Sequence, residues 1–176
     1  MKTKILIAVI LFALNTILCI GQEKISIAIY QDVKLATIGD KKHNYDAFTL
    51  DMIFSLKMQG NQQKFGYLVV FPEFEIADLN ETYYRYSANV GYTLNKLFIK
   101  NFEINGSLGY GIISRENVSS GSFSFNSEIA YKITDNFKIS VLGQFTQRTD
   151  LKWLYDDDTI KFSSFIGIEY NIPIKN

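Results

Sequence analysis

Hydrophobic and polar residues alternate with a period of two along most of the chain. In residues 83–94 (YYRYSANVGYTL), every second position from Tyr84 to Leu94 is apolar, and the positions between are mostly polar or glycine. Because successive side chains of a strand point to opposite faces, this pattern predicts a β-strand with one apolar and one polar face. After the N-terminal segment, no stretch shows a sustained helical period, so we expect an all-β chain.

Eight segments show this alternation, with turn signals between them. The expected strands cover residues 24–38, 45–58, 64–76, 82–94, 101–114, 122–133, 137–148 and 160–172. Ile53 and Phe165 interrupt the polar faces of the second and last strands. Pro72 lacks a backbone N–H, so we expect a bulge or an early end in the third strand.

The connections between the expected strands fall into two alternating sets. Short turns are expected at residues 59–63, 95–100 and 134–136. More varied, polar loops are expected at residues 39–44, 78–81, 115–121 and 149–159. Since alternate connections of an up-and-down barrel lie at the same end, the two sets belong at opposite rims.

Eight antiparallel strands can close into a barrel, which removes unpaired edges. A soluble lipocalin-like barrel places its apolar face inward around a small apolar ligand, whereas an outer-membrane barrel places that face outward against lipid. The interior of eight strands is only just wide enough for side chains to fill. The apolar face consists mostly of Phe, Tyr, Ile, Leu and Met, and these large side chains would overfill the interior. The sequence therefore favours an eight-stranded antiparallel up-and-down transmembrane β-barrel.

The polar face carries charges of both signs among small residues. Its expected charged members are the basic residues Arg85, Lys132, Lys138, Arg148 and Lys161 and the acidic residues Asp51, Glu103, Glu128 and Glu169. A buried carboxylate without a partner is costly. We therefore expect a paired, hydrogen-bonded interior with no open pore; the alternative is a set of solvent-facing charges on a soluble barrel.

Aromatic residues gather near both ends of the expected strands, as in the girdles of membrane barrels. Those near the short turns are Tyr92, Phe98, Phe102, Tyr131, Phe137 and Tyr170. Those toward the longer loops are Phe48, Phe74, Tyr84, Tyr110, Phe123, Phe145 and Phe162.

The first residues have the build of a secretory signal peptide. Lys2 and Lys4 precede an apolar run over 5–14, and small residues follow up to Gly21. We expect residues 1–21 to be cleaved and 22–176 to form the barrel domain. A retained anchor and a lipid-modified Cys19 are the alternatives, but the run is short for a spanning helix. Without Cys19, the mature chain has no cysteine for a disulfide, a thiol nucleophile or a metal site.

Taken together, the signal, the eight alternating strands, the short turns and the polar loops resemble the small outer-membrane β-barrel proteins of Gram-negative bacteria, of the OmpX and OmpA transmembrane-domain kind. The resemblance implies location in the bacterial outer membrane, with both termini in the periplasm and the four longer loops outside the cell. Such proteins often end in an aromatic residue, whereas this chain ends in GIEYNIPIKN, where Tyr170 is the candidate substitute.

Composition and motifs offer little catalytic chemistry. Equal counts of basic and acidic residues, 18 of each, argue against a nucleic-acid partner. The single histidine, His43, lies near Asp40 and Asp46, and we expect it to be solvated, because a base must be held within reach of its nucleophile. The glycine-rich GSLGYG at 106–111 lies within a strand and does not match a phosphate loop.

The loop over 149–159 combines carboxylates with apolar residues. Its YDDDT run (155–159) has oxygen ligands of the kind that divalent cations prefer, but neighbouring side chains diverge, and we expect a hydrated tip. Trp153, Leu154 and Tyr155 suit contact with lipid headgroups or with a partner.

The sequence thus predicts a monomeric outer-membrane barrel with a structural or surface-interaction role. Its expected partners are outer-membrane lipid and an extracellular partner bound through the loops. No catalytic residue, cofactor or metal site is expected. The alternatives are an exported soluble barrel carrying a small apolar ligand and a lipid-modifying barrel enzyme.

Overall fold

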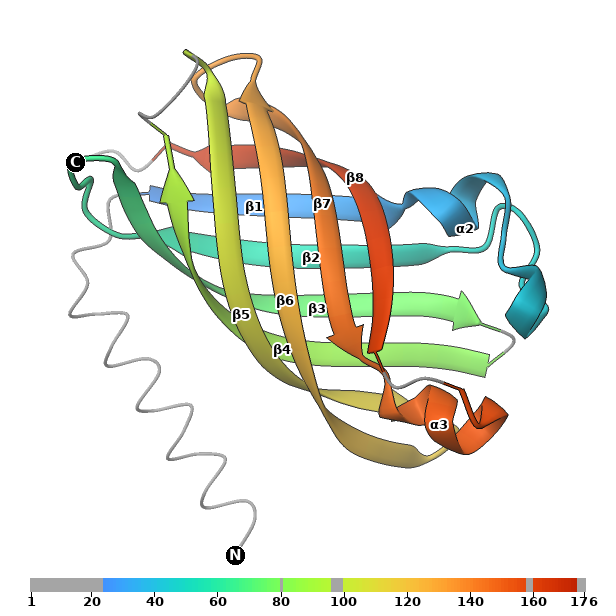
Figure 1. Ribbon diagram of the computed structural model, residues 1–176. Coiled ribbons are helices and arrows are strands. Elements are labelled where there is room, and N and C mark those ends of the chain that lie inside the picture. Colours follow the sequence, from blue (N-terminus) through green and yellow to red (C-terminus); the bar gives the residue numbers. More distant parts are fainter. Residues whose placement is uncertain (1–23, 80, 96–99, 158–159, 174–176) are drawn as a thin grey trace, which may run out of the picture.

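Eight antiparallel strands form a closed barrel in the computed structural model, which describes residues 24–79, 81–95, 100–157 and 160–173 (Figure 1). The strands are β1 (Lys24–Asp32), β2 (Asp51–Gln59), β3 (Gly66–Leu79), β4 (Glu81–Leu94), β5 (Phe102–Arg115), β6 (Val118–Lys132), β7 (Phe137–Gln147) and β8 (Ile160–Ile172). Each strand pairs with the next, and β1 pairs with β8. The predicted fold class is confirmed, whereas the predicted signal peptide (1–21) lies outside the described residues.

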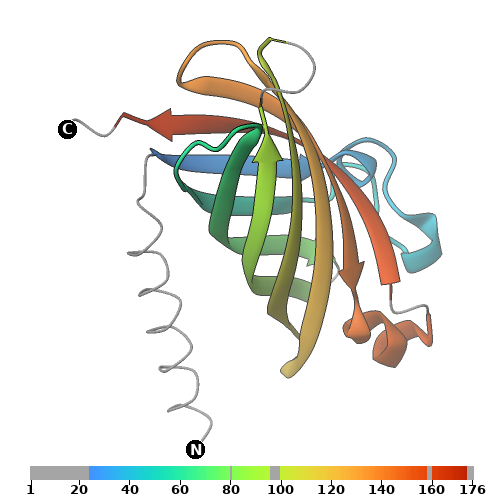
Figure 2. The ribbon, with the colours of Figure 1, turned by 60° about the vertical axis from the view of Figure 1, so that its left-hand side comes forward.

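The two ends of the barrel differ. Strand β1 begins and β8 ends at the rim of the tight turns, which we call the turn end (Figures 1 and 2). The opposite rim, the helix end, carries α2 (Val33–Thr37), the 3₁₀ helix η1 (Lys41–His43) and α3 (Thr149–Tyr155). Among the residues described, no helix is long and apolar enough to span a membrane.

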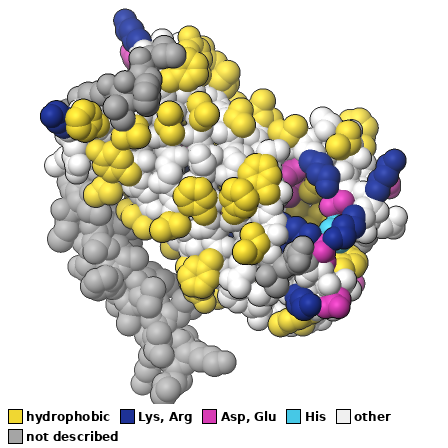
Figure 3. Space-filling model, viewed as in Figure 1, with side chains coloured by type: hydrophobic (Ala, Val, Ile, Leu, Met, Phe, Trp, Pro, Cys, Tyr) yellow, Lys and Arg dark blue, Asp and Glu magenta, His cyan; other side chains and the backbone are white. Residues whose placement is uncertain are grey.

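The apolar face of the strands points outward, as predicted. Along β5, exposed and buried residues alternate, and Leu108 is 64% exposed whereas its neighbour Ser107 is buried. Large apolar side chains exposed on the barrel wall include Ile27, Leu56, Tyr86, Val90, Phe125, Ile129, Val141, Ile166 and Ile168. Figure 3 shows such side chains spread over the visible wall. These strands therefore do not have the inward apolar face that is expected of a soluble carrier barrel.

Ion pairs occupy the interior, which confirms the predicted ionic core, although Oδ1 of the predicted member Asp51 makes no hydrogen bond. The fully buried Arg85 donates to Oε1 of Glu73 at 3.0 Å and to Oγ of Ser124 at 2.7 Å. Nearer the turn end, Glu169 accepts from Lys57 at 2.6 Å and from Lys138 at 2.7 Å. These contacts satisfy charges that would otherwise be costly to bury.

Ile53 and Phe165, which interrupt the polar pattern, lie inside the barrel. Both are fully buried and pack in one cluster with Ala28, Tyr30 and Leu142. Strand pairing sets Ile53 beside Tyr30 and Phe165 beside Leu142. The interior is therefore not wholly polar, because this cluster buries apolar surface across four strands.

Strand β3 neither bulges nor ends at Pro72, contrary to the prediction. Its register against β2 is the same before and after the proline, with Val70 opposite Met58 and Glu73 opposite Ser55. The proline lies opposite Ala88 of β4, and β3 continues to Leu79.

The predicted strand ends are wrong at the helix end, where β1 stops at Asp32 and β2 starts only at residue 51. Asp32 explains the early stop, because its carboxylate accepts from the backbone N–H of Leu35 at 2.7 Å and caps α2. Asp40 caps η1 in the same way, and Asn44 ends it with a left-handed φ of 61°.

The predicted loops at 78–81 and 115–121 are almost entirely strand. Strand β5 reaches Arg115, which pairs with Val118, so only Glu116 and Asn117 turn the chain. Both have positive φ, 49° and 62°, as a type I′ hairpin turn requires. The long connections at this end are therefore the β1–β2 loop (33–50) and the β7–β8 loop (148–159).

Candidate functional site at the helix end of the barrel

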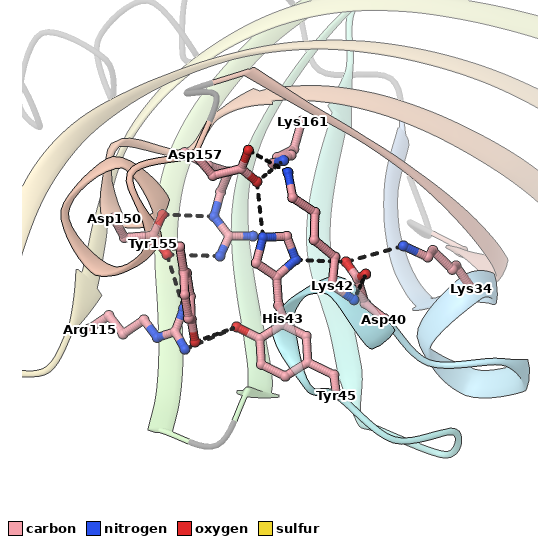
Figure 4. Close-up of polar contacts among 11 residues, drawn as sticks. Lys34, Asp40, Lys42, His43, Tyr45, Arg115, Asp150, Tyr155, Asp157 and Lys161 are labelled. Carbon is pink, nitrogen blue, oxygen red and sulfur yellow. Dashed lines mark hydrogen bonds and ion pairs between the residues drawn. The ribbon is translucent and has the colours of Figure 1, made fainter.

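His43 joins the β1–β2 loop to the β7–β8 loop. Its Nδ1 lies 3.0 Å from Oδ2 of Asp40, and its Nε2 lies 3.0 Å from Oδ2 of Asp157 (Figure 4). The ring also contacts the rings of Tyr45 and Tyr155. His43 is only 6% exposed, so the expectation of a solvated histidine is wrong.

Three lysines extend this contact into an ionic cluster. Lys42 donates to Asp157 at 2.6 Å, and Lys161 pairs with the same carboxylate. Lys34 pairs with Asp40 at 3.1 Å. Partial burial opposes ionisation of Asp40, but hydrogen bonds from His43 and Lys34 hold the pKa of this carboxyl below its usual value. Asp46, which is close in sequence, is exposed and lies outside these contacts.

A second ionic group fastens α3 to the barrel. Arg148 donates to both carboxylate oxygens of Asp150 at 2.8 Å, a bidentate arrangement that fixes geometry well. Arg115 contacts the same carboxylate at 3.4 Å and donates to the backbone carbonyl of Leu79 at 2.7 Å. Burial opposes ionisation of Asp150, but the two arginines hold its pKa below the usual value.

Tyr45 links the two groups. Its hydroxyl accepts from Arg115 at 3.1 Å and lies 3.5 Å from the hydroxyl of Tyr155. Burial is the main reason why the pKa of Tyr45 rises to about 12, and the neighbouring tyrosine adds to it. The hydroxyl therefore stays protonated at neutral pH.

A cavity of about 440 Å³, which we call the mouth cavity, lies between the two long loops. Figure 3 shows a hollow at this end, with charged side chains and the histidine around it. Its wall includes apolar residues of α2, β3 and α3, namely Leu35, Leu79 and Leu151. Asp32 and Asp51, at the ends of β1 and β2 where the barrel begins, line it from within.

The arrangement does not present His43 as a base to a serine. Both ring nitrogens face carboxylates, and a general base needs a free nitrogen within hydrogen-bond reach of its nucleophile. Ser163 and Ser164 line the same cavity, but the described contacts of the ring are with aspartates and tyrosines.

The consecutive aspartates of YDDDT separate in the structure. Asp156 is exposed and pairs with Lys152, whereas Asp157 turns into the ionic cluster. Asp158 and Thr159 lie outside the described residues. Within the part of the chain that is described, no group of three or more histidine, cysteine, aspartate or glutamate residues is placed to hold a metal ion.

The apolar residues of the same loop form part of α3. Trp153 is 60% exposed and Tyr155 is 42% exposed. Trp153 and Leu154 line a second cavity of about 250 Å³, together with Ile113 and Val118 of the β5–β6 hairpin. This exposed edge is available to lipid headgroups or to a partner.

Little in the sequence points to this site, because its parts come from distant segments. Arg115, Asp150 and Lys161 carry no local motif, and 114 residues separate His43 from Asp157. The usable signals are the aspartates before α2 and η1, since Asp32 and Asp40 both occupy N-cap positions.

A scan of protein-family models and a search of curated proteins find no match for this chain. Among solved structures, the Yersinia pestis outer membrane protein Ail in a phospholipid bilayer nanodisc is similar, with 14% identity and a TM-score of 0.54 over 85% of this chain and 99% of that chain. A crystal structure of Ail gives 15% identity and a TM-score of 0.48 over 86% and 99% of the two chains. The crystal structure of Neisserial surface protein A gives 10% identity and a TM-score of 0.46 over 85% of this chain and 95% of that chain. At these identities the likeness concerns the fold alone: the chain has the fold of a small bacterial outer-membrane β-barrel.

Proposed function

We propose that this protein is an integral outer-membrane barrel of a Gram-negative bacterium with a structural or surface-interaction role at its helix end. The observation that carries the proposal is the outward apolar face. Soluble monomers rarely expose apolar patches beyond a few hundred Å². Here Leu108, Phe125, Ile129 and Val141, on three neighbouring strands, are each 47% exposed or more, and their counterparts on other strands continue the surface.

Aromatic residues support a membrane location. Near the turn end, Phe102 and Tyr131 pack with ring centroids 5.0 Å apart. Toward the helix end, Tyr110 packs against Phe123 at 4.8 Å, and Phe145 against Phe162 at 4.9 Å. Such girdles border the apolar band of membrane barrels at both interfaces. Phe98, a predicted member, lies outside the described residues.

Orientation follows from the resemblance to small outer-membrane barrels, which implies that the turn end faces the periplasm. The helix end, with its ionic cluster and the exposed edge of α3, then faces the cell exterior. We propose that contacts with an extracellular partner use this end, as a monomer, through side chains such as Trp153 and Tyr155.

Cell fractionation tests the location. We expect the protein in the detergent-extracted outer membrane, with heat-modifiable migration on a gel. Val90→Arg and Ile129→Arg replace wall residues, and each should cost about 2–4 kcal/mol if placed near the bilayer midplane. Ile133→Arg, beyond the end of β6, is the matched control and should cost only about 0–1 kcal/mol near the interface. Recovery from the soluble periplasmic fraction would refute the proposal.

Catalysis is not part of the proposed function. Both ring nitrogens of His43 are held by carboxylates, which supports this view. The test compares the lipid profiles of cells that express the protein, its His43→Ala variant or neither. Identical profiles are expected, and a new lipid species that disappears with His43→Ala would instead identify a lipid-modifying enzyme.

A further inference from the structure

The mouth cavity contains a buried carboxylate oxygen without a hydrogen-bond partner. Asp51, the first residue of β2, is only 4% exposed and lines the cavity. Its Oδ1 makes no hydrogen bond in the structure. A buried, unsatisfied carboxylate oxygen is costly, so a donor that enters the cavity would gain a strong, charge-assisted bond.

The basic residues around the cavity are already engaged elsewhere. Lys34 pairs with Asp40, and both Lys42 and Lys161 pair with Asp157. Arg148 gives its bidentate contact to Asp150. Each of these lysines and the arginine therefore already contacts a carboxylate, and Oδ1 of Asp51 does not accept from any of them.

The electrostatic surroundings of Asp51 are negative on balance. The charged groups that act on it are the carboxylates of Glu75 and Asp32 and the guanidinium of Arg148. Asp32 also lines the cavity, where one of its oxygens caps α2. At the inner surface of the cavity the carboxylates of Asp32 and Asp51 therefore face a single guanidinium, that of Arg148, which favours a cation over an anion at that end.

The remaining wall favours an organic cation over a metal ion. No metal-ligand group of three or more side chains is found in the described part of the chain. Leu35, Leu79 and Leu151 supply apolar surface, and a volume of about 440 Å³ is in the range of small-molecule sites. We propose that the mouth cavity binds a small organic amine, whose ammonium group donates to Asp51 and whose apolar stem lies against these leucines.

Titration of the purified barrel in lipid nanodiscs tests the site. The probe is n-pentylamine, and its binding is measured by calorimetry or by backbone NMR shifts around Asp51. Its matched controls are 1-pentanol, which lacks the charge, and pentanoate, which reverses it. Saturable binding of the amine at one site is expected, with no binding of either control. Equal binding of pentanoate, or equal competition by Na⁺, would overturn the proposal.

Two variants and one control variant locate the binding. Asp51→Asn keeps the volume and removes the charge, and it should weaken pentylamine binding roughly tenfold or more. Asp46→Asn, which alters an exposed carboxyl of the same loop, should leave binding unchanged. Ser163→Phe fills the cavity from β8 without altering a carboxylate and should also abolish binding.

Heat-modifiable migration shows that each variant has folded. If Asp51→Asn and Ser163→Phe both fold and bind the amine as the parent does, the proposal is wrong. If Asp51→Asn does not fold, Ser163→Phe decides alone. Because the site belongs to the folded barrel, its test in purified protein is independent of the fractionation experiment.

Discussion

Nε2 of His43 lies 3.0 Å from Oδ2 of Asp157, although 114 residues separate them in the chain. The contact joins the two long loops of the helix end, and Asp40 holds the other side of the ring. Neither partner is part of a strand, so the ordering of these loops depends on side chains rather than on the β-ladder.

Replacing the histidine should loosen both loops at once. In His43→Ala, the carboxylates of Asp40 and Asp157 lose the ring that lies between them, and amide exchange in α2, η1 and α3 should become easier by about 1–3 kcal/mol. Exchange in the strands should not change. Lys152→Ala is the control, because its ion pair with Asp156 is exposed and worth little. Faster exchange throughout the barrel would contradict a role confined to the loops.

Acid should release the same loops. The pKa values of Asp40 and Asp150 are held below the usual aspartate value of 3.8. Such groups stabilise the folded loops above that pH, and the stabilisation is lost as the pH falls through their folded values. Emission from Trp153, the only tryptophan and part of α3, should therefore change below about pH 4.

Circular dichroism at each pH separates loop release from unfolding of the barrel. Asp150→Asn removes one of the two titrating groups and should reduce the change in tryptophan emission. An emission change that Asp150→Asn leaves unaltered, or one centred at neutral pH, would refute this assignment.

Two glycines of β5 should differ in how well they tolerate a larger side chain. A Cβ on Gly111 would lie 2.3 Å from the backbone oxygen of Tyr86, whereas a Cβ on Gly106 meets nothing within 4 Å. Gly111→Ala should cost about 1–3 kcal/mol in the free energy of unfolding, as overpacking does. Gly106→Ala should be nearly neutral, and urea unfolding in lipid vesicles measures both. A neutral Gly111→Ala would show that the interior has spare room at this position, against the prediction.

The interior ion pairs should be far more sensitive than those at the rim. Lys138 is 3% exposed and bridges Glu103 and Glu169, each at 2.7 Å. Lys138→Met leaves these carboxylates short of a partner and should cost about 3–5 kcal/mol of unfolding free energy. Lys132 also pairs with Glu103, at 2.8 Å, but it is 35% exposed. Lys132→Met should cost about 0–1 kcal/mol, and a similar loss in both variants would refute the argument.

The barrel could be predicted because one observation, the size of the apolar side chains, decides which face points outward. Phenylalanines and isoleucines on every strand cannot share an interior that eight strands enclose. The roles of Ile53 and Phe165 could not be predicted in this way. A single apolar residue on a polar face can be interpreted only when its neighbours on the adjacent strands are known. Their cluster with Tyr30 and Leu142 depends on strand register.

The helix end was less predictable for a different reason. The alternation around Phe48 resembles that of a strand, yet Phe48 lies in a loop with a φ of 67° and is 88% exposed. The capping aspartate before α2 stops β1, and a local capping bond can outweigh alternation at a strand end. The environment of His43 depends on Asp157, and no short-range pattern relates residues so far apart.

Closure of the barrel pairs Ile25 near the start of the described chain with Ile172 near its end. The hydrogen-bonded barrel therefore cannot close until the last strand has been synthesised. Until then β1 is unpaired on one side, and contacts so distant in sequence are slow to form. Closure must then follow synthesis rather than accompany it, and the unpaired strand edge needs protection in the meantime.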